Sequence, residues 1–92
     1  MNPLSPEQRE ELRHVVLEVL AARHPTAQSL RAIRRLAERE VSFACSEDEL
    51  ESALAFWEPE HVTRELDVAG STAYWRPTAA GVLLVERGFR RK

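Results

Sequence analysis

The sequence predicts one α+β domain, mostly α-helical, with a β-hairpin near its C-terminal end. Apolar residues recur with helical spacing in three segments before residue 60. Residues 62–76 then read as two strands joined by a turn at Gly70, and a capped helical segment follows them. We expect residues 1–92 to form one domain, because this length supports a single core and no linker or repeat interrupts it.

The first helix is expected over residues 5–23. Ser5 is a typical N-cap, Pro6 a typical first helical residue, and Pro25 pushes the residue before it out of the helical region. Spacing at i, i+3, i+4, i+7 and i+8 places Leu12, Val15, Val16, Val19 and Leu20 on one face. Leu17 points away from this face. We interpret it as a scattered surface leucine, with a dimer contact as the alternative.

The second helix is expected over residues 27–39, with Thr26 as its N-cap. The residues expected to face inward are Leu30, Ile33, Leu36, Ala37 and Val41. Arg31, Arg35 and Arg39 recur every four residues on the opposite side, and Arg34 is close to them. This stripe is either an ordinary solvated face or a strip that contacts phosphates, and the spacing alone favours the solvated face.

The third helix is expected over residues 46–57. Ser46 and Glu49 form a capping box, and Pro59 prevents the helix from continuing much beyond Trp57. The inward-facing residues are Leu50, Ala53, Leu54 and Trp57. Residues 41–44 before this helix favour β structure, so we expect a small strand there that pairs with the hairpin.

The hairpin is expected over residues 62–76. His61 marks the turn into its first strand and is expected to adopt positive φ, since His is one of the non-glycine residues enriched in that state. Adjacent residues of a strand point to opposite faces, so one of Tyr74 and Trp75 packs inward and the other is more exposed.

The last helix is expected over residues 78–87, with Thr78 as its N-cap. The residues expected to dock on the core are Val82, Leu83, Val85 and Phe89. A basic tail follows, which suits the dipole of a helix C-terminus without any ligand.

The charges are nearly balanced but unevenly distributed. The net charge is −2, which gives no general attraction to nucleic acid. Residues 1–45 have a net charge of +1 and residues 61–92 a net charge of +3. Residues 46–60 between them have six acids and no base: Glu47, Asp48, Glu49, Glu51, Glu58 and Glu60. Any function has to be compatible with this acidic segment.

The sequence does not support a disulfide-bonded, zinc-binding, membrane-spanning, secreted or enzymatic protein. The single Cys45 cannot form an internal disulfide, and His14, His24 and His61 do not have the spacing of zinc ligands. No run of apolar residues is long enough to cross a membrane, and residues 1–11 do not have the pattern of a signal peptide. We therefore expect a cytoplasmic protein that uses no cofactor or metal. We also expect no enzymatic activity, because no arrangement of nucleophile and base is present, and Cys45 is typical of a small buried hydrophobe.

The chain resembles the small winged helix-turn-helix proteins of bacteria and their phages, with MarR- and ArsR-like regulators among the nearest types. The resemblance lies in the helix over residues 46–57 with its Leu50/Leu54 spacing, and in the junction Tyr74-x-x-x-Thr78-x-x-Gly81. It covers nearly the whole chain. His61 departs from the frequent glycine of the family, and Pro77 departs from the usual aliphatic residue.

The resemblance implies a three-helix bundle with a hairpin wing, and a third helix that reads the major groove. The acids of this helix would repel phosphates, so we expect DNA binding mainly through phosphate contacts instead. The candidate residues are Arg31, Arg34, Arg35, Arg39, Arg64 and Arg76. A transcriptional regulator or a phage-related accessory factor would work in this way.

The alternative is a protein-interaction module that does not bind DNA. The acidic third helix would contact a basic partner, or two copies would form a homodimer by pairing acidic with basic faces. The candidate residues for this contact are Glu47, Asp48 and Glu51.

Overall fold

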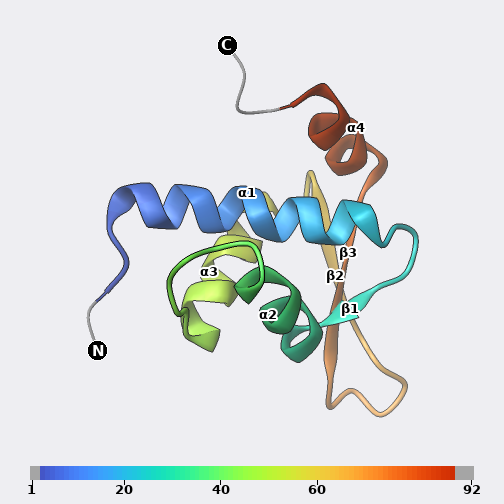
Figure 1. The fold of residues 1–92 in the computed structure, drawn as a ribbon. Coiled ribbons are helices and arrows are strands. Elements are labelled where there is room, and N and C mark those ends of the chain that lie inside the picture. The colour runs from blue at the N-terminus through green and yellow to red at the C-terminus, as the bar shows by residue number, and fades with distance from the viewer. Residues whose placement is uncertain (1–2, 89–92) are drawn as a thin grey trace.

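The computed structural model describes residues 3–88, and this part of the chain has an α+β fold that is mostly helical (Figure 1). Its elements, in chain order, are α1 (Pro6–Ala22), β1 (Gln28–Ser29), α2 (Leu30–Glu38), α3 (Glu47–Trp57), β2 (Val62–Leu66), β3 (Ala73–Pro77) and α4 (Ala79–Arg87). The strands form one antiparallel sheet in the order β1-β3-β2. The predicted fold class is confirmed at this level.

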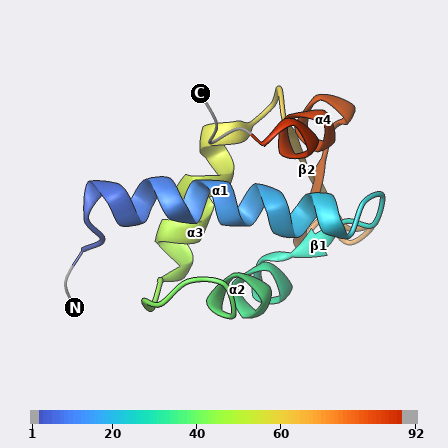
Figure 2. The ribbon, with the colours of Figure 1, turned by 45° about the horizontal axis from the view of Figure 1, so that its top comes forward.

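Helix α1 is the central element of the fold. In Figure 1, helices α2 and α3 lie on one side of it and α4 on the other, and the view of Figure 2 shows α3 crossing α1. The predicted inward face is buried, with Val19 partly buried at its margin. The prediction of a surface Leu17 was wrong: its side chain is fully buried. Because α1 is covered from two sides, it buries a wider stripe than one amphipathic face.

The second helix begins later than predicted, at Leu30, and its N-cap is Ser29 rather than Thr26. The Ser29 hydroxyl accepts a hydrogen bond from the backbone N–H of Ala32 at 3.2 Å. Gln28 and Ser29 are extended and pair with β3 opposite Trp75 and Tyr74. These residues were predicted to be helical, and pairing with a distant strand outweighs their local preference.

The small strand predicted at residues 41–44 does not form. Strand β3 has β1 on one edge and β2 on the other, so neither of its edges is open to a further strand. Val41 is instead buried in the core as a loop residue, and Phe43 packs against the core in part.

Helix α3 agrees with the prediction. Ser46 and Glu49 form the expected capping box, with hydrogen bonds of 3.2 Å and 2.8 Å, and the helix ends at Trp57. Its predicted inward residues are all buried. The Trp57 side chain donates its Nε1–H to the carbonyl oxygen of Arg13 at 2.8 Å, which ties α3 to α1.

The hairpin has the predicted position, and the predicted contrast between Tyr74 and Trp75 holds in β3, whereas β2 is exposed after Val62. Trp75 is buried, whereas Tyr74 is only partly buried on the other face. His61 forms the turn into β2, but its expected positive φ was wrong: among the described residues only Gly70 and Gly88 have positive φ. A hydrogen bond from the His61 N–H to the Trp57 carbonyl oxygen, at 2.9 Å, closes this turn with ordinary backbone angles.

Helix α4 begins after Thr78, whose hydroxyl accepts from the N–H of Gly81 at 3.0 Å, as predicted. Val85 packs against the core as predicted. Leu83 was expected to dock there too but is 45 % exposed, and Leu84 packs against the core in its place. Gly81 faces the body of the protein, and this orientation turns Leu83 outward. The predicted contact of Phe89 lies outside the described residues.

Candidate functional site

Three arginines form a stripe along the solvent face of α2. Arg31, Arg35 and Arg39 are exposed, while Ile33 and Ala37 on the opposite face are fully buried. None of the three forms an ion pair with another residue in the described part of the chain. We call these residues the α2 stripe. Their guanidinium groups can therefore bind an external anion.

The other predicted phosphate contacts do not join the α2 stripe. Arg34 donates to Glu38 one turn later, at 3.3 Å. Arg76 pairs with Glu65 across the hairpin at 2.7 Å. Arg64 is exposed, but it lies opposite Trp75 in the register and hence on the other face of the hairpin from Arg76. The six arginines predicted to contact phosphates therefore do not form one surface. Only the three residues of the α2 stripe lie together without acidic partners among the described residues.

The acidic segment divides into structural and solvated carboxylates. Glu49 completes the capping box of α3, and Glu58 accepts a hydrogen bond from Trp75 Nε1–H at 2.8 Å. The predicted partner-contact residues Glu47, Asp48 and Glu51 are exposed, and no ion pair links them to other described residues. These three carboxylates give α3 a negative outer surface.

The end of the hairpin exposes two large apolar side chains, and one carboxylate orders its turn. Val68 is completely exposed and Leu66 is 55 % exposed. The Asp67 carboxylate accepts a hydrogen bond from the backbone N–H of Ser71 at 2.9 Å, which lowers the pKa of this carboxyl below its usual range. The tip itself presents no cation for a phosphate group.

Cys45 is buried, as predicted. Burial raises the pKa of its thiol above the ordinary value, and the negative charge of Glu38 raises it further. The described residues include no cluster of three or more His, Cys, Asp or Glu that could hold a metal ion. The neutral thiol is a packing group in this position.

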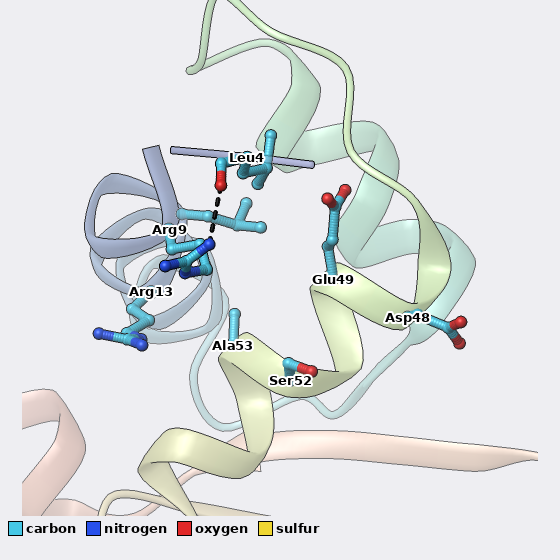
Figure 3. A pocket seen from close by; sticks show the side chains of 8 residues that line it. Leu4, Arg9, Arg13, Asp48, Glu49, Ser52 and Ala53 are labelled. Carbon is cyan, nitrogen blue, oxygen red and sulfur yellow. Dashed lines mark hydrogen bonds between the residues drawn. The ribbon is translucent and has the colours of Figure 1, made fainter. Parts of the chain in front are cut away.

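A pocket of about 170 Å³ lies between the first half of α1 and the first half of α3 (Figure 3). Leu4, Leu12 and Ala53, all buried, form its apolar floor. Its remaining lining residues are Arg9, Arg13, Asp48, Glu49 and Ser52. Figure 3 shows the Arg9 side chain on one wall and the Glu49 side chain on the facing wall.

A second hollow, of about 310 Å³, lies between α1 and α2. Its lining is half apolar and half charged: Val15, Val19, Ala22, Leu36, Glu18, Arg23, Arg39 and Glu40. Sequence reasoning missed both hollows. The only local signal for the first is that Arg9 and Arg13 are four residues apart on α1. The position of Arg9 opposite Glu49 depends on how α1 crosses α3.

Comparison of the chain with protein-family models, with curated proteins and with solved structures found no match. Within the described residues, every helix is too short or too polar to cross a membrane.

Proposed function

We propose that this protein is a winged-helix protein that binds double-stranded DNA mainly through its phosphate groups. Three helices, a hairpin and a closing helix follow one another in the order that the resemblance implies. In such a protein β2 and β3 are the wing, and the role is that of a transcriptional regulator or a phage-related accessory factor.

The observation that carries this proposal is the α2 stripe. Its three guanidinium groups are exposed, lie on one helix face and have no acidic partner among the described residues. Arginine binds phosphate oxygens through several N–H donors, and such contacts position a protein on DNA without reading its sequence. The acids of α3 disfavour insertion of this helix into the major groove, because they repel the phosphates that line it.

The test is fluorescence anisotropy of the protein with a labelled duplex of random sequence, titrated at several salt concentrations. Three phosphate contacts predict a slope of about −2.7 in a plot of log affinity against log salt. The affinity should fall about 40-fold between about 50 mM and about 200 mM salt. Replacing the α2 stripe with glutamine (Arg31→Gln, Arg35→Gln, Arg39→Gln) should remove most of this slope.

Arg34→Gln is the matched control on the same helix. Arg34 already pairs with Glu38, so its replacement should change the slope by clearly less than one unit. Wild-type protein that does not bind the duplex at low salt would contradict the proposal. Binding that survives the triple replacement unchanged would remove the α2 stripe from it.

A second candidate function is a protein-interaction module, as a homodimer or with a basic partner. It is favoured by the exposed acids on α3 together with the exposed apolar side chains Phe56, Leu66 and Val68. Exposed apolar side chains beside charges are typical of interaction surfaces when they form a patch. A homodimer would pair the acids of α3 with the α2 stripe of the other copy.

Light scattering after size-exclusion chromatography, over a range of protein concentrations, tests the homodimer. The wild type should have a dimer mass that falls on dilution, and Glu47→Lys with Glu51→Lys should give a monomer. Glu10→Lys with Glu11→Lys makes the same charge change on an exposed part of α1 and should leave the dimer intact. A wild type that is monomeric at every concentration would contradict the homodimer.

A further inference from the structure

We infer that the pocket between α1 and α3 binds a small aliphatic zwitterion, of the class of a free α-amino acid such as leucine. The inference does not depend on DNA binding, because no residue of the α2 stripe lines this pocket. It rests on the size of the pocket, its apolar floor and the opposite charges of its two walls.

The volume of the pocket limits the size of the ligand. A volume of about 170 Å³ is below the ~300–1,000 Å³ that drug-sized ligands occupy. The floor consists of Leu4, Leu12 and Ala53, so it offers neither an aromatic ring nor a polar side chain. A short aliphatic side chain fits a floor of this size and chemistry.

The Arg9 wall suits a carboxylate. Arg9 donates one N–H to the carbonyl oxygen of Leu4 at 2.8 Å, which fixes its guanidinium group beside the floor (Figure 3). A guanidinium group has five N–H donors in a planar fork, so others are left for a ligand. Arg13 stacks on the Phe56 ring at 4.4 Å instead, and in Figure 3 its charged end points away from the pocket.

The Glu49 wall suits an ammonium group. Glu49 Oε1 accepts from the backbone N–H of Ser46 at 2.8 Å, and this capping bond holds the carboxylate in place. Its second oxygen can accept from a ligand. Asp48 points away from the pocket in Figure 3. Glu49 is therefore the negative group that faces Arg9.

Arg9 and Glu49 face each other but form no ion pair, either with each other or with another described residue. A zwitterion would satisfy both walls at once, while its side chain covers the apolar floor. A ligand with only one charge would leave the other wall without a partner. The Glu49 carboxylate is partly buried, and a partly buried charge interacts with a ligand charge more strongly than a charge in bulk water does, so this loss should be measurable.

The experiment follows backbone amide shifts in ¹H–¹⁵N NMR spectra of the whole chain during titration with L-leucine. The shifts of Arg9, Glu49 and Ala53 should saturate with a common Kd of about 1 mM or tighter. Three analogues each remove one element of the zwitterion. 4-Methylpentanoate has no ammonium group, leucinamide has no carboxylate and glycine has no aliphatic side chain. Each should bind at least about tenfold more weakly than leucine.

Two variants test the walls without disturbing the fold. Glu49→Gln removes the charge but keeps an acceptor for the capping box, and Arg9→Gln removes the guanidinium group at an exposed position. Each should weaken leucine binding about tenfold or more. Glu51→Gln on α3 and Arg23→Gln at the C-cap of α1 are matched controls outside this pocket and should bind leucine like the wild type.

Failure to reach saturation with leucine, up to about 20 mM, would overturn the inference. Equal affinity for leucine, 4-methylpentanoate and leucinamide would also overturn it, because the charged walls would then play no part. Loss of binding in the controls as well as in the wall variants would place the ligand elsewhere.

Discussion

The backbone of α4 at Gly81 packs directly against the carbonyl oxygen of His61, and a Cβ atom at this glycine would overlap that oxygen. The same carbonyl accepts the N–H of Thr78 at 2.9 Å, which holds it in place. The position of such a Cβ also lies 3.4 Å from Leu17 Cδ1, beneath α4. This contact fixes how closely the last helix approaches the turn before β2.

Gly81→Ala should therefore destabilise the protein, although alanine is the better helix former. The overlap forces α4 or the His61 turn to shift, at a cost of about 1–3 kcal/mol in the free energy of unfolding. Urea unfolding followed by circular dichroism measures this cost. Ala80→Gly, at the exposed neighbouring position, should cost only about 1 kcal/mol through helix propensity. A Gly81→Ala protein as stable as the wild type would show that the helix can move away.

The hydrogen bond between Trp75 and Glu58 should contribute to stability through its buried donor. Trp75 is buried, and its Nε1–H donates to Glu58 Oε2 at 2.8 Å. Glu58→Leu would leave this donor without an acceptor and should lower the free energy of unfolding by about 1–3 kcal/mol. Glu58→Gln keeps an acceptor and should cost less. Equal costs for the two variants, measured by urea unfolding, would mean that the bond itself contributes little.

Cys45 should react slowly with a thiol reagent in the folded protein. Burial raises the pKa of its thiol, so the reactive thiolate is scarce near neutral pH and its fraction rises only as the pH exceeds the ordinary thiol range. The absorbance change with an aromatic disulfide reagent measures the rate, and unfolding in urea should accelerate it. A variant with Ala44→Cys and Cys45→Ala moves the thiol to the exposed neighbouring position and should react rapidly. Similar rates for the two folded proteins would contradict the burial of Cys45.

Asp67 should titrate below the usual range of an aspartate. Its carboxylate accepts from the backbone N–H of Ser71, so the folded-state pKa is lowered. A lowered pKa means that this carboxylate stabilises the hairpin turn above its unfolded-state pKa, and that the contribution is lost as the pH falls through the folded-state pKa.

The measurement for this prediction is the ¹³C shift of the Asp67 carboxyl group, with the Ser71 amide shift as a second probe of the same step. Both midpoints should lie below the ordinary value of 3.8. Asp67→Asn should abolish the acidic step at Ser71. A midpoint at or above the ordinary value would show that the turn does not depend on the charged form.

Local signals in the sequence predicted much of the fold correctly. Ser5, Ser46 and Thr78 are N-caps in the structure, and α3 ends at Trp57 before Pro59. These features depend on bonds and steric limits within a few residues, which the sequence displays directly. The burial of Cys45 was also predicted, from its small apolar character and its apolar neighbours.

The predictions were wrong at residues whose secondary structure or burial depends on contacts with a distant segment of the chain. Gln28 and Ser29 are extended because they pair with β3, whereas residues 41–44 pair with no strand and lie in a loop. Leu17 is buried because α1 is covered from two sides, which no periodicity within α1 reveals.

The candidate sites also include features that local sequence predicts and features that only tertiary packing sets. The sequence by itself determined the α2 stripe and the acids of α3, because a helix of known phase places residues at i and i+4 on one face. Only the tertiary structure decided that Arg76 is bound by Glu65 and that Arg9 faces Glu49 across a pocket. Those relationships depend on strand register and helix crossing, which are set by packing over the whole core and not by local preference.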